Sequence, residues 1–549
     1  MTKRRENKCK LREKIFYIVF SFGFSMATFF SIKMPTEFKK ISWLGSSFAD
    51  LLLIVGIFCV SLLSVIFLNK VLDRINGRYE VVEHVIKIQV GYIFIIIFIA
   101  WLPFFLAFYP GNLSSDSYSS IEQALGHITS TAHPVLFTLL VRITLKAGMF
   151  LFHNMNAAIA VFSITQMVLL DGILTYTVRW LGRHGLSGKG QIFTIVYFAL
   201  NPLIVRFSFT MWKDILFSGV MLLLVLFLYD VATGEKKLAD NRDLLHFLVL
   251  ATLAAFLRNR IVYAVIAIFA LLLLVYRSCW KKLLAAFFLT SVLILFVQGP
   301  LYSYLNIKPS NFAEGQGVSL QQIAAVVVED GKLSDSERKF INKIIPLEDV
   351  TKAYKPSTVD NLKYYESFDN EFLNNHSAEY IKVWRSVLFK NPWICTKAWL
   401  MTTRGFWGFN VFIEPFAITW PSKELNIYQM NIIEKITGID LAYLSNGILV
   451  HIEDIPVVRL FFESGGLGWF GMLVALQMLI KKRYRGLLAL LPLNVLWIVL
   501  IASTPIFSEA RYMFVYNLTL PVLFWILFSD GRTEKFEENT ESVLQKEGK

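Results

Sequence analysis

The chain is poor in charged residues and in cysteine. Only 17% of its 549 residues are charged, whereas 55% are hydrophobic and 48 are phenylalanine. The mean hydropathy is +0.53. A soluble globular domain does not carry this much apolar surface, so that class is excluded. The four cysteines are scattered without a Cys-x-x-Cys spacing. We therefore predict no structural disulfide.

Long polar segments are also scarce, and apolar runs of bilayer-spanning length recur along the sequence. The fold class predicted from them is an all-α polytopic membrane protein with about twelve transmembrane helices. The runs lie near residues 14–33, 48–69, 88–109, 157–180, 191–209, 212–230, 244–257, 261–276, 283–304, 457–480, 486–503 and 510–528.

The net charge of +13 would suggest a nucleic-acid partner in a soluble protein. Here the basic residues gather in short segments between apolar runs, as in cytoplasmic loops of membrane proteins. No nucleic-acid partner is therefore predicted. The basic N-terminus lacks a small-residue cleavage site, which indicates a cytoplasmic anchor rather than a cleaved signal peptide. The alternation of basic loops places both termini in the cytoplasm, including a tail over 529–549.

This topology depends on the segment 134–152. If that segment spans the bilayer, every later loop changes sides. Arg142 and Lys146 lie one helical turn apart on one face, and apolar residues fill the rest of the segment. That pattern is typical of an amphipathic helix in the membrane interface. We predict that residues 110–156 form a first outer loop with interfacial helices.

Hydropathy falls between residues 305 and 456, and polar residues become frequent. This segment is predicted to be an extracellular, mainly α insertion between an N-terminal transmembrane module (1–304) and C-terminal transmembrane helices (457–528). Within it, VSLQQIAAVVVEDG predicts a helix capped by Ser319. The stretch SAEYIKVWRSVLFKNPW predicts an amphipathic helix that ends at Pro392.

Several charged residues stand at the outer ends of the predicted spans, where charge is costly and marks a candidate functional site. The cations oppose the positive-inside trend, and an anionic ligand such as phosphate explains them. These cations are Arg206, Lys213, Arg258, Arg260 and Arg511. Asp116 stands in an outer loop without Lys or Arg, and a carboxylate beside a phosphate site suits general-base chemistry. The other candidate binding residues are His133, Asp214, Glu463, Glu509 and Tyr512.

The strings PGNLSSDSYSSIEQ, HPVLFTLL, WKDILFS, RNRIVYA, VSLQQIAAVV and SEARYM occur in this order over most of the chain. In this order they resemble the GT-C superfamily of membrane glycosyltransferases. More closely, they resemble an uncharacterised family of such membrane proteins from Gram-positive bacteria. The resemblance implies a bacterial cell-membrane enzyme with an extracellular active site. It would transfer a sugar, with inversion, from a polyprenyl-phosphate donor to a cell-surface glycan, a teichoic acid-like polymer or a lipid-linked acceptor.

By this resemblance, Asp116 is the base that activates the acceptor hydroxyl, and Lys213, Arg258 and Arg511 hold the donor phosphate. His133 then lies near the sugar or the phosphate. Some members carry two adjacent acids in the first loop, but here Ser117 follows the aspartate. This departure argues against a metal-binding acidic pair, so no cofactor is firmly predicted and a divalent metal is kept as an alternative.

Simpler roles remain open for each residue. Asp116 could cap a helix, His133 could be a turn residue before its proline, and Glu509 and Arg511 could form a surface ion pair. Tryptophans at span ends, such as Trp101, Trp180, Trp212 and Trp469, are expected in interface belts. At the level of the whole protein, a flippase or transporter, or a polymerase or ligase of lipid-linked glycans, is the alternative.

Overall fold

A computed structural model describes residues 2–34, 47–76, 88–126, 130–258, 261–409, 411, 422 and 424–528. Within these ranges the secondary structure is helical, and pairing of extended segments is limited to isolated bridges. The predicted all-α class is thus confirmed, and a helix occupies every predicted apolar run. These helices are α1 (Thr2–Lys33), α2 (Phe48–Asn76), α3 (Val90–Ala107), α6 (Met155–Arg183), α7 (Gly188–Leu200) with α8 (Pro202–Ser208), α9 (Lys213–Ala232), α10 (Asn241–Leu257), α11 (Val262–Val275), α12 (Trp280–Phe296), α24 (Ser464–Ile480), α25 (Leu487–Ser503) and α26 (Phe514–Phe528).

In the described part of the chain, eight helices are long and apolar enough to cross a membrane, or nine if the bent pair α7–α8 is one span. The chain is therefore a polytopic helical membrane protein. The count of twelve stays a prediction, because α10, α11, α24 and α25 have only 14 to 17 residues. The eight include α5 (Val135–Phe152), so its interfacial placement, and the topology that depends on it, stay predictions.

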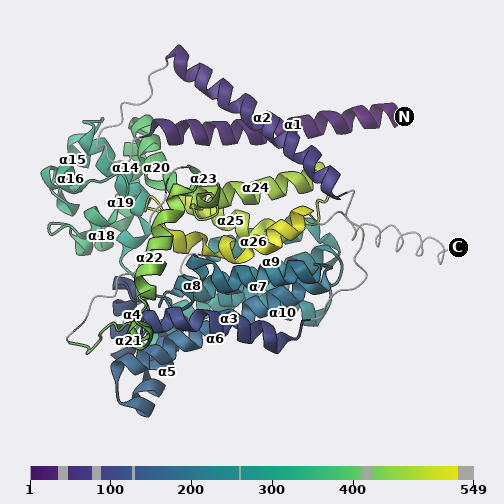
Figure 1. The fold of residues 1–549 in the computed structure, drawn as a ribbon. Helices are drawn as coiled ribbons and strands as arrows, with labels where there is room; N and C mark the ends of the chain where they lie inside the picture. The colour runs from purple at the N-terminus through teal and green to yellow at the C-terminus, as the bar shows by residue number, and fades with distance from the viewer. Residues whose placement is uncertain are drawn as a thin grey trace.

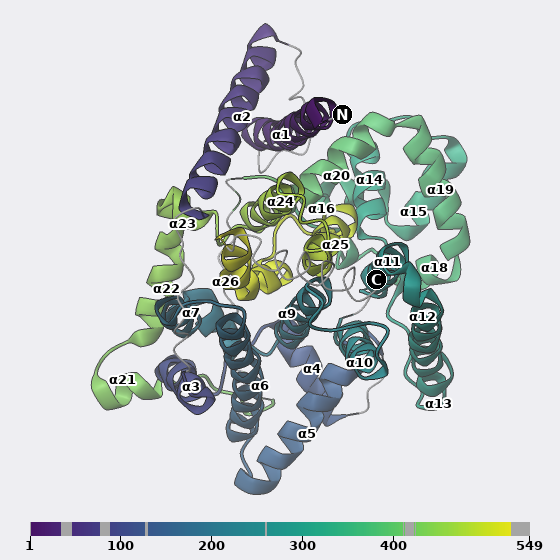
Figure 2. The same ribbon diagram turned by 90° about the vertical axis from the view of Figure 1, so that its right-hand side faces the viewer.

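Helix α9 lies at the centre of the bundle. It is apolar on all sides, as expected of a helix without a water-facing or lipid-facing surface. Almost all of its residues are buried, and it contacts α6, α10, α25 and α26. Figure 2, which views these helices nearly end-on, shows α9 surrounded by them. At about 1.5 Å per residue, its 20 residues separate its two ends by roughly 30 Å.

The first half of the predicted insertion forms a helical unit with its own core of buried apolar side chains. The unit contains α14 (Gly317–Val328), α15 (Asp335–Ile344), α16 (Leu347–Ala353), α17 (Asp360–Lys363), α18 (Asn370–Asn375), α19 (Ser377–Lys390) and α20 (Pro392–Trp407). It lies at one end of the bundle (Figure 1), where α20 also packs on α24 and α25. The predicted stop at Pro392 is confirmed, because α19 ends at Lys390 and the proline begins α20. The predicted cap is wrong: Ser319 lies inside α14 and donates to the carbonyl of Gln316.

The second half of the predicted insertion returns to the bundle. Helix α21 (Ile432–Thr437) and α22 (Leu441–His451) pack on α3, and α22 also contacts α8. In Figure 1, α22 runs across the bundle helices rather than along them. The described residues of 305–456 therefore comprise two structural parts, and the first has a core of its own.

The predicted first outer loop contains α4 (Ser115–Leu125) and α5, which pack on each other. Arg142 of α5 donates hydrogen bonds to three carbonyl oxygens at the end of α4, those of Gln123, Ala124 and Gly126. These carbonyls lack partners within α4, and a cation suits the negative end of a helix. Arg142 thus fixes α4, which carries Asp116, against α5.

Candidate functional site

Two loops from distant parts of the sequence are fastened together at the start of α4 and α9. The amide of Asn112 donates to the carbonyl of Phe209 at 3.1 Å, and the amide of Met211 donates to the carbonyl of Asn112 at 3.0 Å. Because α4 and α9 begin just after these contacts, Asp116 and Lys213 arrive at the same place.

Asp116 does not cap its helix. Ser114 is the N-cap residue, and its amide donates to the hydroxyl of Ser117 at 2.9 Å in a capping box. The Asp116 carboxylate is left free for a tertiary contact, and it forms a 2.5 Å ion pair with Arg511. Ser114 and Ser117, and not Asp116, therefore cap this helix.

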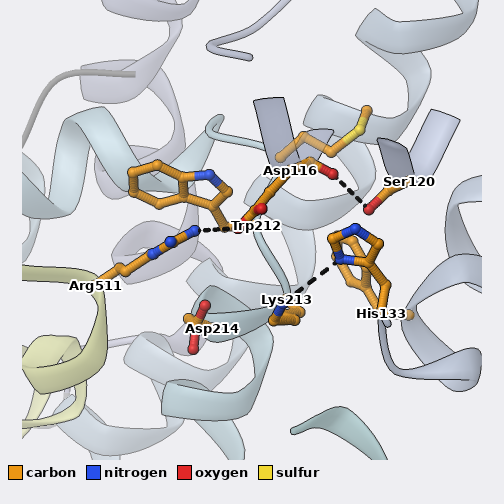
Figure 3. Close-up of a pocket in the computed structure, with 9 residues that line it drawn as sticks. Asp116, Ser120, His133, Trp212, Lys213, Asp214 and Arg511 are labelled. Carbon is orange, nitrogen blue, oxygen red and sulfur yellow. Dashed lines mark hydrogen bonds and ion pairs between the residues drawn. The ribbon is translucent and has the colours of Figure 1, made fainter. Parts of the chain in front are cut away.

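A small pocket lies between these groups (Figure 3). Its lining residues are Asp116, Ser120, His133, Phe137, Met211, Trp212, Lys213, Asp214 and Arg511. Figure 3 shows His133 and Lys213 on one side of the carboxylate and Arg511 on the other. The pocket is too small to enclose a drug-sized ligand. The lining side chains are closely packed, and their charges suit a compact anion such as a phosphate rather than a whole lipid-linked sugar.

The Asp116 carboxylate is held in its ionised form. Burial raises the pKa of this group, but the charges of Arg511 and Lys213 and the hydrogen bond from Arg511 outweigh burial and lower the pKa to about 2. The site therefore presents a carboxylate that remains charged at any physiological pH while its two cations stay in place.

His133 is held in its neutral form. Its burial and the charge of Lys213, whose Nζ lies 3.5 Å from its Nδ1, lower the pKa to about 4, although Asp116 acts in the opposite direction. A neutral imidazole beside an ammonium group places its lone pair toward the cation, so Lys213 donates and His133 accepts. His133 thus orients Lys213 without adding charge.

A second layer of charged groups lies behind the pocket. Asp214 forms a 3.1 Å ion pair with Arg258, and the guanidinium of Arg258 lies 4.5 Å from the ring centre of Tyr512. Glu509 contacts Arg511 at 3.5 Å, and burial raises the pKa of Glu509 although Arg511 opposes the shift. Since Arg258 neutralises Asp214, Lys213 and Arg511 are the cations that face the pocket, and Asp116 is the carboxylate between them.

The helical unit outside the bundle holds the loop that carries Arg511. The amide of Phe507 donates to the carbonyl of Ser357 at 2.7 Å, and the amide of Val359 donates to the carbonyl of Pro505 at 3.1 Å. These backbone contacts leave the loop before α26 little freedom, so they set where Arg511 points.

The structure brings most of the predicted site residues together. Asp116, His133, Lys213, Asp214 and Arg511 line the pocket, and Arg258, Glu509 and Tyr512 form the layer behind it. Glu463 is elsewhere: it is buried at the start of α24 and pairs with Arg459 at 3.0 Å. Arg260 lies outside the described residues.

Arg206 does not join the pocket, contrary to its grouping with the other cations. Its guanidinium lies 3.7 Å from the ring centre of Phe108 and bonds to Asn446 of α22. The reason is the bend between α7 and α8, which turns Arg206 toward α22 instead of toward α4.

Sequence reasoning missed Trp212 as a pocket residue. It was expected in an interface belt, but it is 5% exposed, lies 4.8 Å from the Arg511 guanidinium and donates to the hydroxyl of Ser114 at 2.7 Å. Trp101 and Trp180 are also buried rather than in a belt. The available signal was position: Trp212 directly precedes Lys213, and a buried indole needs an acceptor.

The chain belongs to a family of unknown function, DUF6020, whose model matches residues 126–541. The match includes His133, Lys213, Asp214 and Arg511 and begins ten residues after Asp116. The comparisons with curated proteins and with solved structures found no match.

Proposed function

We propose that this protein is a membrane glycosyltransferase of the GT-C type. It transfers a sugar from a polyprenyl-phosphate donor in the bilayer to a cell-surface glycan or a lipid-linked acceptor, on the extracellular face of a bacterial cell membrane. The observation that carries the proposal is an ionised carboxylate, Asp116, which lines one small pocket together with two cations, Lys213 and Arg511. The resemblance of the sequence to that superfamily supports the same reaction.

The charge arrangement supports an exchange of partners at Arg511, whose guanidinium pairs first with Asp116 and then with a phosphate. Arg511 pairs with Asp116. A donor phosphate competes for the same guanidinium, because Arg binds phosphate and carboxylate through the same fork of N–H groups. The positive charge of Arg511 lowers the pKa of Asp116. When Arg511 turns to the phosphate, that charge is shared between the phosphate and Asp116, so the pKa of Asp116 rises. Asp116 thus becomes a competent base only after the donor has bound.

The proposed step is a single displacement. The acceptor oxygen bonds to the anomeric carbon as the bond from that carbon to the donor phosphate oxygen breaks. The hydroxyl proton passes to Asp116, and the bonding electrons leave with the polyprenyl phosphate. Lys213 and Arg511 stabilise the charge that develops on this leaving group. His133, neutral and in contact with Lys213, keeps the ammonium directed at the pocket.

Asp116→Asn tests the proposal, because it keeps the shape of the side chain and removes the base. Glu122→Gln is the matched control, since Glu122 is an exposed acid on the same helix. A strain that lacks the gene is complemented with wild type or with either variant at equal membrane levels, and its surface glycans are analysed for sugar composition. Loss of a general base lowers the rate by about 10²–10⁴-fold. Wild type and Glu122→Gln are therefore expected to restore one sugar that Asp116→Asn does not.

Full restoration by Asp116→Asn would overturn the role of Asp116 as a base. A transporter or flippase of lipid-linked glycans would then fit better, because transport needs no proton acceptor at that position. A polymerase or ligase would instead show altered chain length with unchanged sugar composition.

A further inference from the structure

A second polar cluster lies at the opposite end of α9 from the Asp116 pocket. Asp230 is in the last turn of α9, Glu235 follows in the loop, and His184 directly follows α6. The side chains of His184 and Asp230 are 4% and 5% exposed, whereas that of Glu235 is 56% exposed. We refer to His184, Asp230 and Glu235 as the Asp230 cluster. Buried polar atoms need partners, so the contacts of the imidazole decide what the cluster holds.

The imidazole has one nitrogen whose role is fixed. Nδ1 of His184 lies 2.9 Å from the carbonyl oxygen of Trp180. A carbonyl only accepts, so Nδ1 carries the proton and a neutral ring has a bare lone pair on Nε2. Nε2 is buried without a hydrogen-bond partner among the described residues. It faces Asp230 Oδ1 at 3.3 Å and Glu235 Oε1 at 3.2 Å.

Three lone pairs directed at one point repel one another unless a positive charge lies between them. The ligand atoms of the three residues all lie within 4.8 Å of one another, close enough for a single ion to contact all three. Tetrahedral zinc with bonds of about 2.0–2.1 Å to nitrogen and oxygen places its ligands about 3.3–3.4 Å apart. The two distances from Nε2, 3.3 and 3.2 Å, are close to this spacing.

The surroundings of the Asp230 cluster resemble those of metal ligands. Asp230 Oδ1 accepts from the indole N–H of Trp180 at 2.7 Å, and Lys236 contacts the other oxygen, Oδ2, at 3.0 Å. Each oxygen of Asp230 is thus oriented by its own donor, and Nδ1 of His184 is oriented by a backbone carbonyl. Such outer contacts fix the orientation of ligating side chains. Lys236 neutralises one of the two carboxylates, so the cluster retains a net negative charge.

We propose that His184, Asp230 and Glu235 bind a divalent transition-metal ion, best matched by zinc, with water completing the coordination. The ion would join the end of α6 to the end of α9, and the exposed Glu235 would give it access from solvent. This site is separate from the Asp116 pocket, and its test needs no knowledge of the sugar donor.

Zinc binding by the purified full-length chain in detergent tests the proposal. The protein is stripped with a chelator and dialysed against Zn²⁺, and bound metal is measured by mass spectrometry. Glu235→Gln is the main variant, because replacing an exposed side chain leaves the packing intact, and His184→Gln is the second. His451→Gln is the control, since His451 is exposed, pairs with Asp454 and is not a member of the candidate metal group.

Wild type and His451→Gln are expected to retain one zinc per chain. Glu235→Gln and His184→Gln are expected to bind it at least about tenfold more weakly. Substitution with Co²⁺ should give the visible absorption of a four-coordinate ion in wild type and not in Glu235→Gln. Absence of bound zinc in wild type, or equal binding by wild type and Glu235→Gln, would overturn the site and leave a protonated imidazole between the carboxylates.

Discussion

The two ends of α9 carry the same types of side chain in opposite electrostatic arrangements. At the Asp116 pocket, the imidazole of His133 faces the ammonium of Lys213. At the Asp230 cluster, the imidazole of His184 faces two carboxylates. At the first end two cations, Lys213 and Arg511, lie beside the carboxylate of Asp116, whereas at the second end Lys236 contacts one of the two carboxylates, that of Asp230. The first end therefore suits an anion, and the second suits a cation.

The difference shows that residue type alone does not set the ligand of a buried polar site. A histidine, an acidic residue, a lysine and a tryptophan occur at both ends, and each tryptophan N–H has a side-chain acceptor. What differs is which groups the imidazole nitrogens face. In low-dielectric surroundings the groups around the imidazole therefore decide whether the site favours an anion or a cation.

The largest expected effect is on the free energy of unfolding, when the aspartate at either end of α9, Asp214 or Asp230, is replaced by asparagine. Asp214→Asn leaves Arg258 without its carboxylate; these side chains are 1% and 13% exposed. Removing one partner of a buried ion pair costs about 3–5 kcal/mol. Asp230→Asn costs less in zinc-free protein, because Lys236 is 25% exposed and can turn to water. Denaturation in detergent with a chelator present measures both, and equal losses would contradict the comparison.

A smaller effect is expected in the pH dependence of stability. The pKa of His133 is lowered from 6.5 to about 4 in the folded chain, so between these values the unfolded chain binds more protons. Stability contributed by neutral His133 is complete above pH 6.5 and is lost as the pH falls toward 4. Between pH 7 and pH 5 this amounts to roughly 2 kcal/mol. Thermal unfolding of His133→Gln should lose that part of the pH dependence, whereas His451→Gln should keep it.

The smallest expected effect is the difference in stability between variants of the two buried indoles, Trp212 and Trp180. Trp212→Phe removes a hydrogen bond to a serine hydroxyl, and Trp180→Phe removes one to the carboxylate of Asp230. A neutral hydrogen bond contributes about 0.5–1.5 kcal/mol, and one to a charged group about 1.5–3 kcal/mol. Trp180→Phe should therefore destabilise the chain by about 1 kcal/mol more than Trp212→Phe, as measured by detergent-phase unfolding. The reverse order would show that packing rather than charge governs these sites.

Much of the fold was predictable because long apolar runs have few stable conformations in a bilayer. Each run became a helix, and the break at Pro392 was located correctly. The Ser319 cap failed because the local signal did not identify where the helix began, and the serine bonds back to Gln316 from inside α14. The placement of α5 stayed open, since its length and hydropathy meet the requirements of a span and its basic residues suit an interface.

The candidate site was predictable in part, because charge at the end of an apolar helix is costly and therefore indicates a candidate functional residue. Asp116, Lys213 and Arg511 were found in this way. Arg206 and Glu463 carried the same signal but pair with Asn446 and Arg459 away from the pocket. Local sequence does not indicate which of several buried charges face one another.

The sequence by itself determined a helical polytopic membrane protein with a helical segment outside its main bundle, because hydropathy and helical periodicity act locally. Only the tertiary structure decided that Asp116 meets Arg511, 395 residues away, and that His184 faces Asp230 and Glu235. These pairings depend on how the helices around α9 pack and on the loops fastened at its ends. The electrostatic interactions that define both clusters form between side chains that lie far apart in the sequence.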